Sequence, residues 1–469
     1  MKLTHLLACL GALTGSGVFA GRVPYHNVAA ARHIEDLNQG WRFHFGADAP
    51  DAPSPAYNDA GWAQVSLPHT WNRLGAYSIT RAPDANDKQG IGTYRLHFTG
   101  PKADATKRHY LQFDGVGNIA TVWLNGVKLG EHRGAFSRFR FDVTGLLKAG
   151  ADNILVVQAD NSKPAPGAST QDVIPLGADF FIYGGIYRGV SLISANATSI
   201  DLMDYAGPGV YAHTAYIGAD GATIAVRAQV RGVVAGGVPV RAVVAIDDAQ
   251  DRPAAPPLMI PVHATKAGAA EISGTLLLRH PHLWNGRADP YLYHLSVSLY
   301  RSGQRLDAVT VPLGVRTFRV DADKGFFLNG KHLALVGAAR HQDRMGKGWA
   351  LSPQDHAEDM QIMADMGANT VRMAHYQHAQ EWDDAADRTG MVAWAEIPFV
   401  NAASFGDGEP ATEALKANAR QQLRELIHQS YNHPSIFFWS VGNEVDIGAA
   451  FGRGKKPSRS VELLRELAA

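Results

Sequence analysis

The sequence has 469 residues, and because domains usually contain about 100–200 residues, it predicts two to four domains. Apolar residues make up 46% and charged residues 19%, a composition typical of globular proteins that excludes a largely disordered chain. Lysine plus arginine and aspartate plus glutamate both number 44, so the net charge is zero and argues against nucleic acid or an anionic membrane as partner. A neutral or small ligand is therefore expected.

The N-terminus has the pattern of a secretory signal peptide. Lys2 is followed by an apolar run from Leu6 to Leu13, and Ala20 provides a small residue for cleavage, so residues 1–20 are predicted to be removed. The location is then secreted or periplasmic. Lipidation at Cys9 is a less favoured alternative, because few apolar residues precede it. Cleavage would remove the only cysteine, and no later apolar run is long enough to cross a membrane.

Residues 21–195 are predicted to form a first β-sandwich domain. Strands are expected at Tyr94–Phe98, Thr121–Leu124 and Asn153–Gln158, where apolar and polar residues alternate or a short apolar run occurs. The Asn125-Gly126 step between apolar residues indicates a tight hairpin. Closely spaced strands without helical periodicity favour a sandwich.

Residues 196–318 are predicted to form a second, smaller sandwich of immunoglobulin type. Strands are expected at Thr223–Val226, Val243–Ile246 and Tyr291–Leu299, with alanine and proline frequent between them.

The pattern changes near Phe326, and residues 319–469 predict alternating strands and helices. Four such β/α units in series imply a parallel sheet and correspond to half of an eight-fold barrel. The expected strands are Leu333–Val336, Thr370–Met373, Val392–Ile397 and Ile436–Val441; the expected helices are Gln354–Met366, Ala379–Arg388, Glu413–Tyr431 and one beginning at Val461.

Polar side chains follow each of the four expected strands. His341, His375 and Glu396 follow the first three, and Asn443-Glu444 follows the fourth. Barrel enzymes carry their reactive groups at the C-terminal ends of the strands, so these residues are expected to share one pocket.

Each of these residues also has a purely structural interpretation. Glu444 follows an aromatic run, and burial among aromatic rings would desolvate its carboxyl group and raise its pKa, as a general acid requires. The spacing is equally compatible with a carboxylate that only stabilises the start of a helix. His375 is compatible with a structural or a ligand-binding role. For His341 the favoured interpretation is a residue of an ordinary loop. For Glu396 it is a supporting residue that does not itself react.

Arg372 alternates with the apolar Val371 and Met373 and would therefore point into the barrel. A buried arginine needs a carboxylate partner, which Glu396 or a glutamate outside this sequence would provide. A zinc site formed by His341, His375 and His378 is less favoured, because no two of them have the spacing of ligands on a helix.

Several segments together resemble glycoside hydrolase family 2, and the resemblance covers nearly the whole mature chain. It implies a jelly-roll sugar-binding domain over residues 21–195, an immunoglobulin-like β-sandwich over 196–318 and the first half of a (β/α)8 TIM barrel over 319–469. The matching segments are Trp439–Glu444, Asn432–Ser435, Phe327–Lys331 with Gly337, Arg340–Asp343, Arg372–Tyr376 and Asp179–Arg188.

The resemblance also implies roles for individual residues. Glu444 would be the acid/base and Asn443 would bind the sugar 2-hydroxyl, while Asp179, His341 and His375 would hold other hydroxyls. No cofactor is implied; a divalent ion occurs near the site in some relatives, but no ligand cluster is evident here. The chain departs from the family pattern at Ala374, usually serine, and at Gly189, usually aspartate.

Within the family, the segments around His341 and Glu396 look most like bacterial β-galactosidases, so a retaining β-galactosidase acting on terminal galactosides is expected. A β-glucuronidase and a non-catalytic carbohydrate-binding protein are the alternatives. Retaining enzymes need two carboxyl groups about 5–5.5 Å apart. The nucleophile is expected beyond Ala469, so residues 1–469 alone are expected to be inactive. A homo-oligomer remains open.

Overall fold

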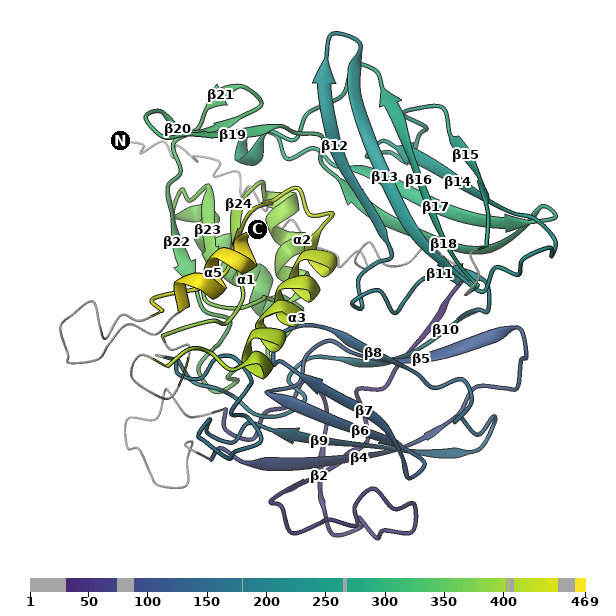
Figure 1. Ribbon diagram of the computed structural model, residues 1–469, viewed down its shortest axis with the longest axis vertical. Coiled ribbons are helices and arrows are strands. Elements are labelled where there is room, and N and C mark those ends of the chain that lie inside the picture. Colours follow the sequence, from purple (N-terminus) through teal and green to yellow (C-terminus); the bar gives the residue numbers. More distant parts are fainter. Residues whose placement is uncertain are drawn as a thin grey trace, which may run out of the picture.

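The computed structural model describes residues 31–73, 88–178, 180–264, 268–401, 404, 409–445 and 460–469. The predicted signal peptide and Asp179 therefore lie outside the described residues. Figure 1 shows two all-β parts and a third part that combines a parallel sheet with helices. The expected succession of two sandwiches and a β/α region is confirmed.

The first sandwich contains two antiparallel sheets, with strand orders β1-β10-β5-β8 and β3-β2-β4-β9-β6-β7. Alternate side chains such as Leu111 and Val157 face inward and form its core. The hairpin predicted at Asn125-Gly126 joins β6 to β7, and both residues have positive φ, 53° and 85°. Its strands are β1 (His33–Asp36), β2 (Trp41–Phe45), β3 (Ala63–Val65), β4 (Ile91–Thr99), β5 (Lys107–Phe113), β6 (Ile119–Leu124), β7 (Val127–Arg133), β8 (Phe139–Asp142), β9 (Asp152–Asp160) and β10 (Val190–Asn196).

The second sandwich pairs β11-β13-β12, with β16 also on β13, against a sheet of order β15-β14-β17-β18. Inward-facing valine, isoleucine and leucine side chains of both sheets form one core. Its strands are β11 (Ser199–Ile200), β12 (Val210–Gly218), β13 (Gly221–Arg231), β14 (Val240–Asp247), β15 (Leu258–Val262), β16 (Ala269–Leu278), β17 (Tyr293–Arg301) and β18 (Gln304–Leu313). A three-stranded sheet of β19 (Phe318–Asp321), β20 (Gly325–Leu328) and β21 (Lys331–His332) leads into the third part.

The third part is built on a four-stranded parallel sheet of order β22-β23-β24-β25. The strands alternate with helices along the chain, as expected, and element bounds agree with prediction to within about two residues except at the first strand. The elements are β22 (Gly337–Arg340), α1 (Pro353–Asp365), β23 (Thr370–Met373), α2 (Gln380–Thr389), β24 (Val392–Glu396), α3 (Glu413–Ser430), β25 (Ile436–Ser440) and α5 (Ser460–Ala468).

The prediction of the first strand at Leu333–Val336 is wrong, because β22 begins only at Gly337, one residue after the predicted strand ends. Leu335 and Val336 are exposed, so their apolar character does not mark a buried strand. A Cβ atom at Gly337 would lie 1.9 Å from the carbonyl oxygen of Thr370. The strand therefore starts where a glycine lets the backbone approach β23 closely.

The two faces of the parallel sheet differ. Val371, Met373 and Ala395 pack in one core with side chains of α1, α2 and α3. On the opposite face, Trp394 is 42% exposed and Arg372 is half-buried. The alternation that places Arg372 opposite Val371 and Met373 is thus as predicted. No helix of the described residues is long and apolar enough to cross a membrane.

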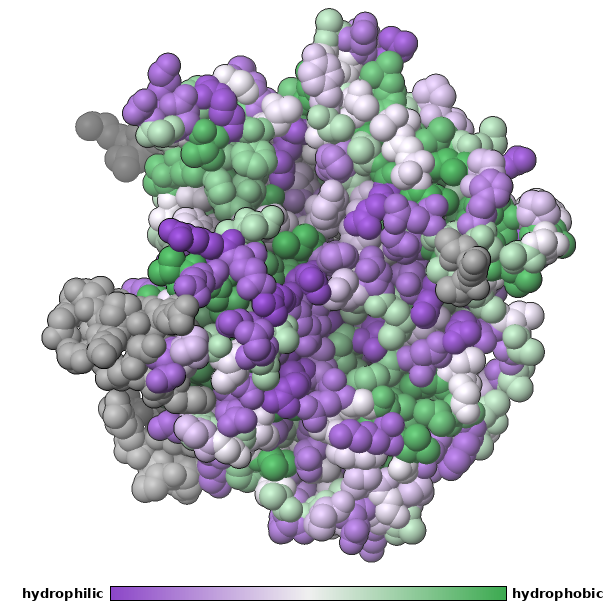
Figure 2. All heavy atoms as spheres, in the orientation of Figure 1, coloured by the Kyte–Doolittle hydropathy of each residue, from purple (hydrophilic) through white to green (hydrophobic). Residues whose placement is uncertain are grey.

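Helix α3 joins the parallel sheet to the first sandwich through polar contacts. Glu425 accepts hydrogen bonds from His132, at 3.0 Å, and from Ser137, at 2.5 Å, and all three side chains are buried. Asn418 donates to the carbonyl oxygen of Arg133 at 2.8 Å. Figure 2 shows the molecule in the orientation of Figure 1, with hydrophilic residues gathered in the middle of the visible face, over α3 and its border with the first sandwich.

Candidate active site

The C-terminal ends of the parallel strands bring together most of the predicted site residues. Glu396, the last residue of β24, is completely buried. One carboxylate oxygen accepts a hydrogen bond from Arg372 Nε, and the other lies 2.8 Å from His375 Nδ1. Glu396 is therefore the carboxylate partner predicted for Arg372. An ionised carboxylate this deep is stable only with such compensation, so the three side chains form one unit.

Asn443 extends this unit to the loop after β25. Its Oδ1 accepts a hydrogen bond from Arg372 Nη2 at 2.7 Å, and its side chain is buried. Its backbone N–H donates to the carbonyl oxygen of Phe399 at 2.9 Å, and its own carbonyl accepts from Asn401 at 3.1 Å. Because Oδ1 is held by Arg372, the amide NH2 is oriented as the group available to a ligand.

His341 and His375 meet at the same strand ends. Their ring centroids are 5.3 Å apart with an interplanar angle of 78°. The ring of Phe180, from the first sandwich, lies 5.2 Å from His341 and 6.3 Å from His375. Asp179 is not described, but its neighbour Phe180 brings this segment of the first sandwich to the strand ends of the barrel part.

The buried, desolvated environment that the sequence predicts for the carboxyl group of Glu444 is not found. Glu444 is exposed rather than desolvated, and its backbone is left-handed with φ of 51°. Phe438 and Trp439, which end the aromatic run, are themselves only half-buried, so they do not enclose the carboxyl group. Glu444 nonetheless directly follows Asn443, which places it beside the buried unit.

Sequence reasoning missed an arginine that connects the histidine loops to the first sandwich. Arg188 Nη2 donates to Oε1 of Gln342 at 3.3 Å and to the carbonyl oxygen of Gln377 at 3.0 Å. Its Nη1 donates to the carbonyl oxygen of Phe136 at 2.5 Å. Gln342 Oε1 also accepts from the backbone N–H of Ala379 at 2.6 Å. Arg188 ends the Asp179–Arg188 segment, and that motif was the available signal.

The third histidine of the disfavoured zinc interpretation has a different environment. His378 is buried, and its Nδ1 lies 3.3 Å from Arg340 Nη1. Burial, and then the charge of Arg340, hold the pKa of His378 well below its ordinary value. Among the residues that the structure describes, no group of three His, Cys, Asp or Glu side chains is arranged to bind a metal ion.

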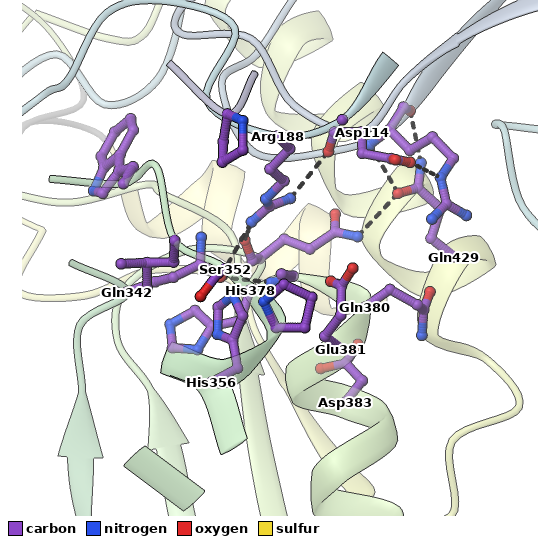
Figure 3. A pocket seen from close by; sticks show the side chains of 18 of the residues that line it. Asp114, Arg188, Gln342, Ser352, His356, His378, Gln380, Glu381, Asp383 and Gln429 are labelled. Carbon is purple, nitrogen blue, oxygen red and sulfur yellow. Dashed lines mark hydrogen bonds and ion pairs between the residues drawn. The ribbon is translucent and has the colours of Figure 1, made fainter. Parts of the chain in front are cut away.

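A cavity of about 290 Å³ lies beside this site. Residues of the first sandwich and of the segments that begin α1 and α2 line it, including Arg188, Gln342 and His378 (Figure 3). None of the six predicted site residues that the structure describes lines it. The cavity is therefore distinct from the strand-end cluster, although the loops that carry His341 and His375 contribute to both.

Three family models match successive parts of the chain. They are described as the sugar binding domain of glycosyl hydrolases family 2 for residues 34–196, glycosyl hydrolases family 2 for 210–316, and the TIM barrel domain of glycosyl hydrolases family 2 for 319–467. These ranges coincide with the two sandwiches and the β/α part of the structure.

Individual relatives agree with these matches. A β-glucuronidase of Bacteroides fragilis is 40% identical over 87% of this chain and 56% of its own length. A β-galactosidase of Bacteroides ovatus is 30% identical over 89% of this chain and 47% of its own length. The structure of Bacteroides uniformis β-glucuronidase 2 covalently bound to cyclophellitol-6-carboxylate aziridine matches with a TM-score of 0.81 and 31% identity, over 93% of this chain and 50% of that one. The chain thus spans about half the length of these relatives.

Proposed function

The chain belongs to glycoside hydrolase family 2, and we propose that the protein is a retaining β-glycosidase whose sugar site lies at the ends of β23, β24 and β25. The observation that carries this proposal is the buried unit in which Glu396 holds both Arg372 and His375, and Arg372 in turn orients Asn443. Such a unit fixes polar groups in advance of binding, which is what positioning of a substrate requires.

The proposed roles are those that the family pattern implies, and the bond from Arg372 to Asn443 supports the role of Asn443. The amide NH2 of Asn443 donates to the sugar 2-hydroxyl, and the imidazoles of His341 and His375, with Asp179, bind other hydroxyls. Glu444 protonates the glycosidic oxygen as it leaves and later takes a proton from the attacking water. The carboxylate that attacks the anomeric carbon is not assigned among the described residues. Glu396 is unsuited to that role, since both its oxygens are occupied and it is completely buried.

The favoured substrate is a terminal β-D-glucuronide. The 40% identical relative is named a β-glucuronidase, and the inhibitor bound in the Bacteroides uniformis structure carries a 6-carboxylate. The sequence alone favoured a β-galactoside, and this preference is revised. A β-galactoside remains the second candidate because a 30% identical relative is named a β-galactosidase.

Kinetics with chromogenic substrates test the proposal. The protein is expressed from its complete reading frame and assayed with 4-nitrophenyl β-D-glucuronide and β-D-galactoside, and NMR follows the anomer first released. We expect preference for the glucuronide, release of the β-anomer, and a fall in kcat/KM of about 10²–10⁴-fold in Glu444→Gln. Glu35→Gln on β1, which is half-buried and is not a site residue, serves as control. Preference for the galactoside would refute the substrate, and full activity of Glu444→Gln would refute its role.

Asp179→Ala tests whether the first sandwich contributes to the sugar site. We expect weaker sugar binding, because a carboxylate forms strong hydrogen bonds to hydroxyl groups. Unchanged KM and Kd would remove Asp179 from the site. Isothermal titration with galactose and glucuronate on the same protein tests the non-catalytic alternative, since binding without any turnover would support a carbohydrate-binding protein instead.

We further propose that the protein is exported, as the N-terminal pattern predicts. Mass spectrometry of the protein recovered from its natural host is expected to show a mature chain that begins at Gly21. A mature chain that retains Met1 would contradict export by this signal.

A further inference from the structure

The segment that carries His341 leaves the parallel sheet after Arg340, the last residue of β22. It leads into a tight turn that two backbone hydrogen bonds close: Arg344 donates to Gly348 at 3.1 Å, and Gly348 donates to Arg344 at 2.9 Å. The sheet fixes Arg340, whereas Arg344 lies beyond the sheet. The position of the His341 ring therefore depends in part on what holds Arg344 relative to the strand.

Arg340 provides a rigid support at the end of the strand. Its Cζ lies 4.0 Å from the centroid of the Trp382 ring, and the residue is 7% exposed. Its Nε and Nη2 both donate to Oδ2 of Asp359 on α1, at 2.9 and 2.6 Å. The stacked ring and the two charged hydrogen bonds leave the guanidinium and the carboxylate little freedom to move.

The second oxygen of Asp359 holds the turn. Oδ1 accepts a hydrogen bond from Nη2 of Arg344 at 2.8 Å. A single carboxylate thus connects the residue directly before His341 with the residue three positions after it. Its side chain is 23% exposed, so water screens these bonds only in part.

The turn makes further contacts with the beginning of α1. Arg344 Nη1 donates to Asp355 at 2.8 Å and to Glu358 at 2.7 Å, and Lys347 Nζ donates to both oxygens of Asp355, at 2.8 and 2.7 Å. Asp355 also forms the capping box of α1 with Ser352, so its substitution would disturb the helix itself. Among these carboxylates, the one that ties the turn to the strand end through Arg340 is that of the preceding paragraph.

We propose that Asp359 is a positioning residue for sugar binding, which fixes Arg344 against Arg340 and thereby holds His341 at the ends of the strands. The inference rests on the proposed function, in which the imidazole of His341 binds a sugar hydroxyl. Both oxygens of Asp359 are engaged by arginines, so its effect on sugar binding passes through them.

Asp359→Asn breaks this link with little change in size. Asparagine keeps one acceptor oxygen, so one of the two arginines faces an NH2 group instead of an acceptor. For the enzyme expressed from its complete reading frame, we expect KM for 4-nitrophenyl β-D-glucuronide to rise about tenfold with a smaller change in kcat. Glu358→Gln is the matched control, because this adjacent carboxylate also bonds Arg344 but is 62% exposed. It should change KM less than about twofold.

Arg344→Gln removes the same link from the other side and covers the case in which Asp359→Asn does not fold. We expect a similar rise in KM of about tenfold. The double variant should be little worse than either single variant, because both substitutions remove one connection. A rise in KM equal to the product of the two single effects would show that Asp359 acts independently of Arg344 and would overturn the inference.

NMR of the Cε1–H signal of His341, in protein with 13C-labelled histidine, reports on the ring without any substrate. His341→Ala assigns the signal. We expect it to shift or broaden in Asp359→Asn and in Arg344→Gln, and to keep its wild-type position in Glu358→Gln. Equal signals and equal KM values in Asp359→Asn and Glu358→Gln would overturn the inference, because a merely structural carboxylate would leave the ring of His341 in place.

Kinetics of His341→Ala separate this inference from the proposed function. A KM that rises in His341→Ala and stays at the wild-type value in Asp359→Asn would overturn the inference alone. An unchanged KM in His341→Ala, or no hydrolysis by the wild type, would refute the proposed function. In that case a displaced His341 signal in Asp359→Asn would still support the positioning of the ring, and an unchanged signal would overturn it.

Discussion

His375 Nδ1 lies 2.8 Å from Oε2 of Glu396, a completely buried carboxylate whose other oxygen accepts from Arg372. This relationship fixes the ring of His375, because a hydrogen bond at Nδ1 leaves Nε2 as the nitrogen that faces a ligand. The same carboxylate neutralises Arg372, which orients Asn443. Glu396 thus acts on the sugar site through its neighbours and is a positioning residue.

Glu396→Gln removes the negative charge and keeps the size of the side chain. Arg372 loses the charge that compensates it, but its side chain is half-buried and water screens part of the loss, so we expect a loss of stability of about 2 kcal/mol in urea unfolding. Sugar affinity should fall with it, since His375 and Asn443 lose their orientation. Glu35→Gln on β1, which is half-buried and is not part of this unit, is the control. Unfolding curves that superimpose for both variants would contradict the role of Glu396.

Phe180→Ala tests the contact between the first sandwich and the histidines. The Phe180 ring lies 5.2 Å from His341 and 5.2 Å from Tyr376, so its removal takes away a contact that holds the His341 ring. We expect sugar affinity to fall about tenfold, about 1.4 kcal/mol. The neighbouring Phe181, 36% exposed, provides a matched control as Phe181→Ala. Equal effects of the two substitutions on Kd would mean that Phe180 contributes only general packing.

Arg188→Ala tests whether the arginine positions the two histidine loops. We expect KM to rise about tenfold with a smaller change in kcat, because the loops bind substrate and Arg188 itself does not touch it. The deleted side chain borders the cavity, so millimolar guanidinium can enter and should restore KM toward that of the wild type. Methylammonium, which cannot form the same fork of hydrogen bonds, is the control. Loss of activity that guanidinium does not reverse would indicate a structural role alone.

The sequence predicts those parts of the site that depend on position relative to a strand. Thr370–Met373 was predicted with the bounds of β23, and Arg372 faces Glu396 because alternation places both on one face. The start of β22 was not predictable, since it depends on close approach of Gly337 to Thr370 and not on local apolarity.

Other features depend on contacts between distant parts of the chain. Arg188 and Gln342 are 154 residues apart, and no periodicity brings them together. The exposure of Glu444 was likewise not predictable, because an aromatic run excludes water only where its rings are enclosed, and Phe438 and Trp439 are half-buried. Strand ends can thus be read from a sequence, whereas the groups that connect domains require the tertiary structure.

A buried acidic cluster on α2 predicts how stability changes with pH. Burial raises the pKa of Asp383 to about 6 and that of Asp384 to about 7. Burial alone would lower the pKa of His433, but the charge of Asp387 and a hydrogen bond of 2.6 Å to it raise that pKa to about 9. All three values lie above those of an unfolded chain, about 4 for aspartate and 6.5 for histidine. Each group therefore binds its proton more tightly in the folded state.

All three groups change the free energy of unfolding in the same direction. A group whose pKa is raised by folding stabilises the protein fully at a pH below its pKa in the unfolded chain. This stabilisation is lost as the pH rises through its pKa in the folded protein. Asp383 and Asp384 lose their contribution between about pH 4 and 7, and His433 between about pH 6.5 and 9. Below pH 7 the lowered pKa values of His356 and His378 act in the opposite direction, so we expect the thermal unfolding midpoint to fall from about pH 7 to pH 9.5. Asp387→Asn keeps an acceptor for Ser435 but removes the charge that raises the pKa of His433, so the fall above pH 7 should shrink. The exposed Asp220→Asn should keep the wild-type slope. A midpoint that stays constant or rises between pH 7 and 9.5 in the wild type would show that His433 is not protonated in the folded protein.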